Sequence, residues 1–367
     1  MSAGSGIRRE LLSDLAISLA SGILLAVGGS AIAALTPVHA DISVPTWLFV
    51  AIAATSFPAV FLLTRRLTRP GPQVFIMISA FAQTRWLAGL LDSAARSFDH
   101  HGMDLIVKLP QHDYSGQSQA RELKAIRKKK RALVGGVIVC SHPQAIRREL
   151  ADFSTTTGLP IVFVDIRPFH QVEDCPPRTV FVGCDADEIG ERAAQWVAQE
   201  LREAGKDRPA ILVVAGEAQD GRHRAFAAKT HDMTPLSKLH INTQGNFSRE
   251  SAREIVDQHL RHLHRRGESL DAIYCTNDEM ALGAVDAVKE HEARGNQHAG
   301  LFILGVDGTP DALATIKSGA TPFRATIIQD PRRIADAAVD LLLRMRAGES
   351  VPTQTLVTST VYPSSSS

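Results

Sequence analysis

The chain has 367 residues, of which 44% are hydrophobic and 22% are charged, and its formal net charge is +1. This length predicts roughly two domains of about 150 residues each. The near-neutral, globular composition argues against a general nucleic-acid-binding protein. The four cysteines form no CxxC pair, which favours buried apolar thiols over a zinc site or a disulfide framework.

Two uncharged segments near the N-terminus have the length of membrane-spanning helices. They cover residues 15–35 and 44–64 and follow a tail of residues 1–14. A helix needs roughly 20 apolar residues to cross the hydrocarbon core. Because the connection between the two segments is short, the sequence predicts a transmembrane hairpin over residues 15–64.

The flanking charges bear on the topology of this hairpin. Arginines stand at positions 8, 9, 65 and 66, outside the two segments, and the loop between the segments has no Lys or Arg. The positive-inside rule therefore favours the cytoplasm for the soluble region. A cleaved signal peptide is an alternative interpretation, because residues 38–40 resemble a cleavage site.

From residue 73 onward, short apolar runs alternate with helical patterns in two runs of about 130 residues each, which predicts an α/β fold with parallel sheets. The predicted strands cover residues 73–79, 104–108, 137–139, 161–164, 179–182, 210–214, 239–241, 272–275, 301–306, 325–329 and 356–361. The predicted intervening helices include residues 117–130, 248–261 and 331–346. The Ser-rich tail, residues 364–367, is predicted to be disordered.

Small polar residues follow two successive strands in the second half. Asn277-Asp278 comes after strand 272–275, and Asp307 comes after strand 301–306. In open α/β sheets, ligands bind in the crevice beyond the carboxyl ends of the strands. We therefore expect these residues to form the floor of a binding cleft.

The neighbours of these polar residues indicate which of them are free for a ligand. Asp278 can cap the following helix, which would leave the Asn277 amide free to bind adjacent hydroxyls. Thr309 and Pro310 supply a helix cap and a first helical residue, so Asp307 has no local partner, and a buried carboxylate needs donors. Helix capping by Asn277 itself is the alternative interpretation.

Three sequence blocks resemble the type I periplasmic sugar-binding proteins, in particular the ribose-binding proteins of ABC importers. The blocks are NDEMALGA from Asn277, VDGTPDAL from Val306 and ATIIQDP from Ala325, and the resemblance extends over residues 73–363. It implies two doubly wound lobes that are joined by three crossovers and close on a ligand. The first lobe would comprise residues 72–178 and 331–350, and the second lobe residues 180–329 and 354–363.

The resemblance also implies ligand contacts in the second lobe. Arg222, in the segment GRHRAF, matches the family's ligand-binding arginine, with Arg224 as a rival. Gln329 matches a strand-end glutamine at the hinge, and Phe247 matches an aromatic residue that packs on the sugar ring. The alternatives are a surface arginine, a hinge hydrogen bond, and a hydrophobic staple between Phe247 and the next helix.

The first lobe departs from the family pattern. Only Trp86 or Phe81 stands near the position of the paired phenylalanines that hold the sugar. Asp165 matches an aspartate after the fourth strand, but the arginine that should follow it is displaced by one position, to Arg167, and a one-residue shift points a side chain elsewhere. Ser141, after the third strand, completes the expected ligand contacts. These departures leave the identity of the ligand open.

The resemblance implies a non-catalytic receptor that closes on a sugar or polyol and delivers it to an ABC permease, and the N-terminal hairpin would anchor this receptor in the membrane. A sensor that signals to a membrane partner is the alternative.

No GxSxG, Walker or GxGxxG motif is present, so we expect neither an enzyme nor a cofactor. His259, His262 and His264 favour a solvated helix face over a metal site. The resemblance favours a periplasmic soluble region and the arginines favour a cytoplasmic one; we expect the periplasmic side of a bacterial inner membrane.

Overall fold

The computed structural model describes residues 71–363, apart from residues 81–84, 113, 129 and 170. The predicted membrane hairpin and the predicted disordered tail lie outside these residues. Within the described part of the chain, no helix combines the length and the apolar character needed to cross a membrane.

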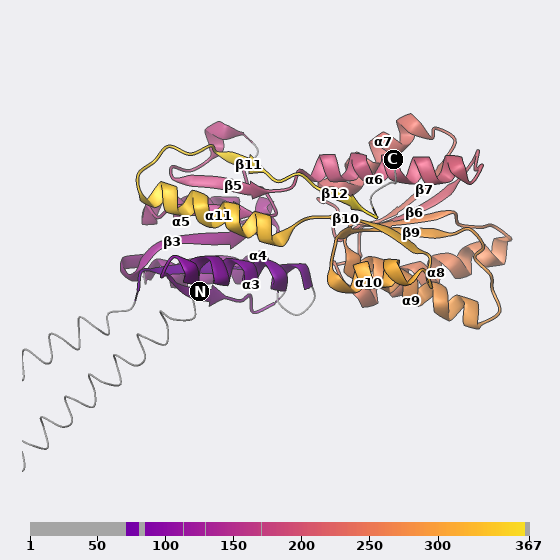
Figure 1. Cartoon of the computed structure of the whole chain (residues 1–367), viewed down its shortest axis with the longest axis horizontal. Coiled ribbons are helices and arrows are strands. Elements are labelled where there is room, and N and C mark those ends of the chain that lie inside the picture. The colour runs from indigo at the N-terminus through magenta and orange to yellow at the C-terminus, as the bar shows by residue number, and fades with distance from the viewer. Residues whose placement is uncertain (1–70, 81–84, 113, 129, 170, 364–367) are drawn as a thin grey trace, which may run out of the picture. The chain divides into compact units, whose positions relative to one another are not determined.

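Two six-stranded sheets organise the described residues (Figure 1). The first sheet has the order β11-β5-β4-β3-β1-β2, and the second has the order β12-β10-β9-β8-β6-β7. Neighbouring strands are parallel except for the antiparallel pair β10–β12. The strands of the first sheet are β1 (Gln73–Met77), β2 (Asp104–Lys108), β3 (Leu133–Val139), β4 (Ile161–Val164), β5 (Thr179–Gly183) and β11 (Gln354–Leu356). The strands of the second sheet are β6 (Ala210–Val214), β7 (Lys238–Asn242), β8 (Ala272–Cys275), β9 (Phe302–Asp307), β10 (Phe323–Ile328) and β12 (Thr360–Tyr362).

Helices cover both faces of each sheet and define two lobes. In the first lobe the helices are α3 (Arg85–His100), α4 (Gly116–Lys128), α5 (Pro143–Thr157) and α11 (Pro331–Arg346), with short 3₁₀ turns at Lys130–Ala132 and Val172–Asp174. In the second lobe they are α6 (Ala186–Glu203), α7 (Gly221–Met233), α8 (Arg249–Arg266), α9 (Asp278–Ala293) and α10 (Pro310–Ser318). The predicted two-lobed α/β architecture is confirmed.

The apolar runs of the sequence become strands that are buried on both faces, as parallel sheets require. In β1, Val74 and Ile76 belong to the same core as α3 and α11, whereas Phe75 and Met77 pack with α4 and α5. Successive side chains of a strand point to opposite faces, so one uninterrupted apolar run supplies both helix layers.

The chain crosses between the lobes three times, as the resemblance implied, but two boundaries differ from the prediction. β5 pairs with β4 over Thr179–Val182, so it belongs to the first lobe and the first crossover falls at Cys184-Asp185, not before Val180. The single closing strand predicted over residues 356–361 is two strands, β11 and β12, on opposite sides of the third crossover. Gln329 begins the second crossover, between β10 and α11.

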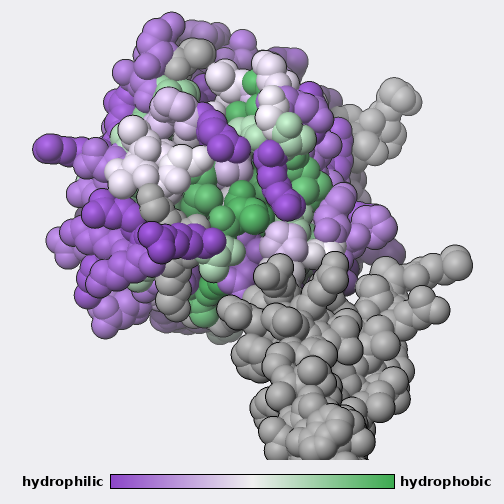
Figure 2. All heavy atoms as spheres, turned by 90° about the vertical axis from the view of Figure 1, so that its left-hand side faces the viewer, coloured by the Kyte–Doolittle hydropathy of each residue, from purple (hydrophilic) through white to green (hydrophobic). Residues whose placement is uncertain are grey.

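Figure 2 views the described residues from the first-lobe side. Hydrophilic side chains dominate this face and surround a smaller hydrophobic area. Many apolar side chains of this lobe are buried in the cores on either side of the sheet.

Candidate ligand-binding cleft

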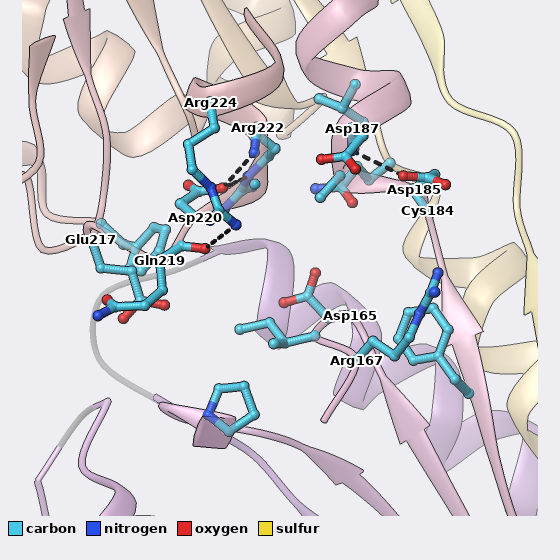
Figure 3. Close-up of a pocket in the computed structure, with 18 of the residues that line it drawn as sticks. Asp165, Arg167, Cys184, Asp185, Asp187, Glu217, Gln219, Asp220, Arg222 and Arg224 are labelled. Atoms are coloured by element: carbon cyan, nitrogen blue, oxygen red, sulfur yellow. Dashed lines mark hydrogen bonds and ion pairs between the residues drawn. The ribbon is translucent and has the colours of Figure 1, made fainter. Parts of the chain in front are cut away.

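A cavity of about 260 Å³ lies between the two lobes. It is bordered by the segments that follow β4 and β5 in the first lobe and by the segment that follows β6 in the second lobe (Figure 3). This is the crevice beyond the strand ends in which α/β proteins bind ligands. Its charged and amide residues are Asp165, Arg167, Asp185, Asp187, Gln144, Glu217, Gln219, Asp220, Arg222, Arg224 and Gln329.

Arg222 lies at the start of α7 and contributes a fixed positive charge to the cavity. Asp220 caps this helix, and its Oδ1 accepts from the Arg222 backbone N at 3.1 Å and from the Arg222 Nε at 2.9 Å. The guanidinium carbon of Arg222 lies 5.7 Å from the centre of the Phe247 ring. The carboxylate of Asp220 raises the pKa of Arg222 although burial opposes it. The rival, Arg224, also lines the cavity and donates to the Gln219 carbonyl at 3.3 Å.

Asp307 lies immediately behind the cavity rather than on its surface. It is 6% exposed, and its Oδ1 accepts a hydrogen bond of 3.0 Å from Nε2 of Gln329, which does line the cavity. Burial raises the pKa of Asp307 well above its usual range; the nearby Asp278 adds to this and Arg222 opposes it. Thr309 caps α10, as predicted, so Asp307 is free of a capping role.

The capping prediction for the neighbouring loop is wrong. Asn277, not Asp278, caps α9: its Oδ1 accepts from a backbone N at 2.9 Å, and its Nδ2 donates to the Phe247 carbonyl at 3.3 Å. Asp278 is fully buried, and its carboxylate accepts from the Thr309 N at 2.7 Å and from Thr326 Oγ1 at 2.6 Å. A buried carboxylate needs such donors, which is why Asp278 turns inward and leaves the cap to Asn277.

The first-lobe side of the cavity is formed by Asp165 and Arg167. Figure 3 shows the Asp165 carboxylate pointing into the cavity towards the loop that carries Asp220 and Arg222. Burial raises the pKa of Asp165 to about 6, and the positive charge of Arg222 opposes the rise. Arg167 lines the cavity but turns away from Asp165, since its guanidinium carbon lies 5.1 Å from the centre of the Phe181 ring. The one-position displacement of this arginine therefore has the consequence expected from the sequence.

Four predicted contacts within the described residues do not line the cavity: Asn277 and Asp307, described above, and Trp86 and Ser141. Trp86 is 6% exposed and packs in the core, and its Nε1 donates to the Gln329 carbonyl at 2.8 Å, so it is not a stacking platform. Ser141 is buried; its N donates to Gln119 Oε1 at 2.7 Å and its Oγ to a backbone carbonyl at 3.4 Å. Phe81 lies outside the described residues. The polar groups of Trp86 and Ser141 are therefore already hydrogen-bonded to other groups of the fold.

Strained backbone is concentrated around the cavity. In the described part of the chain, seven non-glycine residues have positive φ, and all but Arg178 lie at the cleft or next to residues that line it. These residues are Tyr114, His142, Asp165, Asn246, Phe247 and Asp307. Such conformations cost of order 1–3 kcal/mol each and cluster at functional sites. The backbone therefore marks the same region as the side chains.

Contacts between the lobes also cross at the cleft. His142 Nδ1 lies 2.9 Å from Glu217 Oε2, the rings of Tyr114 and Phe247 are 5.0 Å apart, and Arg85 pairs with Asp311 at 3.0 Å.

The sequence interpretation missed Glu217 and Asp220. Both follow the carboxyl end of β6, so the strand-end rule that identified Asn277 and Asp307 also applies to them.

The fold and the cleft together define a two-lobed α/β protein that binds a small ligand between its lobes. The chain belongs to the periplasmic binding protein domain family, whose model matches residues 75–350. It is 25% identical over 267 residues to a putative rhizopine-binding protein of Rhizobium meliloti, which covers 71% of this chain and 79% of the relative. It is 26% identical over 173 residues to the D-allose-binding periplasmic protein of Escherichia coli strain K12, which covers 47% of this chain and 52% of the relative.

Solved structures share the fold. A periplasmic solute-binding protein of an ABC transporter from Actinobacillus succinogenes, with bound D-allose, matches with a TM-score of 0.67 at 20% identity, over 79% of this chain and 96% of that one. A solute-binding protein from Bacillus halodurans with bound myo-inositol matches with a TM-score of 0.65 at 18% identity, over 80% and 95% of the two chains.

Proposed function

We propose that this protein is a non-catalytic receptor that closes its two lobes on a polyhydroxylated ligand of the size of a monosaccharide. The observation that carries the proposal is the convergence of Arg222, Asp165, Gln329 and Phe247 on one cavity between the strand ends of the two lobes. Carboxylate, amide and guanidinium groups bind adjacent hydroxyls, and an aromatic ring packs on the apolar face of a sugar. The ligands named for the family relatives, D-allose and myo-inositol, have this chemistry.

The proposal includes delivery of the ligand to an ABC permease, because two of the relatives are named as binding proteins of such transporters. The signalling alternative predicts the same ligand and differs in the partner.

We also propose that residues 15–64 anchor the receptor in the inner membrane, with the lobes on the periplasmic side. Phosphatase fused to the C-terminus should then be active, and an inactive fusion would place the lobes in the cytoplasm and exclude delivery to an importer.

A thermal-shift screen of the full-length protein against sugars and polyols tests ligand binding. Ligand at a hundredfold its dissociation constant should stabilise the protein by about 2.7 kcal/mol. Arg222→Met should abolish the shift, and Arg202→Met, on the exposed side of α6, should leave it unchanged. A screen in which no sugar or polyol shifts the unfolding temperature, or a shift that survives in Arg222→Met, would overturn the proposal.

A further inference from the structure

Negative charge exceeds positive charge in the lining of the cleft. The lining carboxylates are Asp165, Asp185, Asp187, Glu217 and Asp220. The lining guanidinium groups are Arg167, Arg222 and Arg224. Asp307 adds a further acidic group directly behind Gln329. A ligand that enters this cavity therefore meets more carboxylates than cations.

The three arginines offset only part of this negative charge, because the five lining carboxylates outnumber them. Arg222 is bound to Asp220 through its Nε, and Arg224 donates to a backbone carbonyl. Arg167 lies over the Phe181 ring, one position beyond the place where it would stand beside Asp165. The displacement of that single arginine removes a positive charge from the neighbourhood of Asp165.

Two carboxylates are left with unused acceptor oxygens. Within the described residues, the Asp165 side chain forms neither an ion pair nor a hydrogen bond, although Figure 3 shows it pointing into the cavity. Asp220 is 8% exposed, and its Oδ2 is buried without a hydrogen-bond partner while its Oδ1 holds Arg222. A buried carboxylate oxygen without a donor is costly. The Asp220 Oδ2 is enclosed by the protein, whereas the Asp165 carboxylate is only partly buried and faces the cavity, so a bound ligand can supply donors to Asp165.

We propose that the cleft is selective for a cationic polyol, such as an amino sugar or an aminocyclitol, whose ammonium group binds at Asp165. The hydroxyl groups of such a ligand bind Arg222 and Gln329, as in the proposed function, on which this inference rests. A neutral sugar satisfies the hydroxyl-binding groups but leaves the excess negative charge enclosed when the lobes close. An ammonium provides up to three donors and also balances that charge.

Matched ligand pairs test this inference by calorimetric titration of the full-length protein. The pairs are D-glucosamine with D-glucose, D-galactosamine with D-galactose, and an aminodeoxyinositol with its parent inositol. We expect at least one amine to bind at least tenfold more tightly than its neutral parent. The preference should decrease between 0.02 M and 0.5 M NaCl, because salt screens charge attraction, whereas the binding of the neutral parent should hardly change.

The variant Asp165→Asn keeps the shape of the side chain and removes its charge. It should reduce the preference for the amine to about twofold or less, because it weakens the binding of the amine more than the binding of the neutral parent. The control Asp152→Asn, on the exposed face of α5, should retain the full preference. A preference that survives in Asp165→Asn, or tighter binding of the neutral parents throughout, would overturn this inference and leave the proposed function intact. Failure of both ligand classes to bind would overturn the proposed function as well.

Discussion

Asp307 illustrates how single residues at this cleft combine strain with buried charge. Its φ is 121°, in a region that side chains rarely occupy, and it is 6% exposed. Burial and the neighbouring Asp278 both raise the pKa of its carboxyl group. The fold holds an unfavourable carboxylate in an unfavourable backbone conformation, and we propose that this residue serves ligand binding at a cost in stability.

We therefore expect Asp307→Gly to stabilise the unliganded protein and to weaken ligand binding. Glycine adopts positive φ without steric cost, so the gain should be about 1 kcal/mol even after the loss of the hydrogen bond from Gln329. Ligand affinity should fall at least tenfold. Urea unfolding and calorimetric titration measure the two effects, and a variant that is both less stable and equally tight in binding would contradict this explanation. Gly308→Ala, at a glycine with a φ of 72°, is the opposite control and should destabilise the protein.

Asp278 shows the opposite case, a buried carboxylate with a structural role. It connects the start of α9 to the loop after β9 and to β10 through Thr309 and Thr326. Asp278→Ala should cost at least about 1–3 kcal/mol, because it leaves two buried donors unpaired. The exposed Glu292→Ala, in the same helix, should change stability by no more than about 0.5 kcal/mol. Chemical denaturation compares them, and equal effects would show that the buried bonds contribute nothing.

His259 introduces a dependence of stability on pH. Burial is the main cause that lowers its pKa to about 4, and the nearby His240 and His262 add to the effect. An unfolded histidine titrates near 6.5, so between about pH 6.5 and pH 4 the unfolded chain binds the proton more tightly. Stability from this group is therefore complete above pH 6.5 and decreases as the pH falls.

We expect His259→Gln to reduce the loss of thermal stability between pH 7 and pH 5 by a few degrees. The difference between wild type and variant is the informative quantity, because buried carboxylates such as Asp165 change stability in the opposite direction over part of this range. His231→Gln, in α7, provides a comparison. Parallel pH profiles for wild type and His259→Gln would contradict the assignment.

At the scale of elements, two glycines allow helix pairs to pack closely. A Cβ on Gly190, in α6, would lie 2.3 Å from the Arg222 carbonyl, and a Cβ on Gly283, in α9, would lie 2.1 Å from the Arg249 carbonyl. In both cases the neighbour is backbone, so the helices themselves must separate. The contact between α6 and α7 involves Arg222, which lines the cavity, whereas the contact between α8 and α9 involves Arg249, which does not.

This difference predicts two outcomes for the same substitution. Gly190→Ala and Gly283→Ala should each destabilise the protein by about 1–3 kcal/mol, less the gain of up to about 1 kcal/mol in helix propensity. Only Gly190→Ala should also weaken ligand binding, because it displaces the start of α7 and with it Arg222. Unfolding and titration of both variants test this, and equal effects on affinity would show that the α6–α7 contact does not position Arg222.

The sequence patterns were sufficient to predict the helices and strands, but they did not predict which distant residues these elements would contact. The apolar run over Thr179–Val182 is recognisably a strand, but its lobe depends on pairing with β4, and no local pattern encodes that pairing. The choice of cap between Asn277 and Asp278 depended in the same way on Thr309 and Thr326, which are 31 and 48 residues beyond Asp278. The strand-end rule depends only on where each apolar run stops, and neither of the residues that it named lines the cavity, because Asn277 caps α9 and Asp307 lies behind Gln329.

At the scale of the whole two-lobed unit, we expect ligand binding to depend on contacts that cross between the lobes. Arg85 and Asp311 form such a contact on the surface, with side-chain exposures of 64% and 44%. Exposed ion pairs contribute about 0.2–1 kcal/mol and are screened by salt. The buried pair of Arg222 and Asp220, with side-chain exposures of 15% and 4%, is screened much less.

Arg85→Ala should therefore weaken ligand binding by no more than about fivefold, mainly through faster dissociation, because the closed state loses one contact between the lobes. The effect should disappear in 0.5 M NaCl, whereas the loss of binding in Arg222→Met should persist. Stopped-flow dissociation at low and high salt separates the two variants. Small-angle scattering should show the radius of gyration decreasing when ligand binds to the wild type. An Arg85→Ala effect that is independent of salt would mean that this residue contributes through packing, and that the charge pair does not help to hold the lobes together.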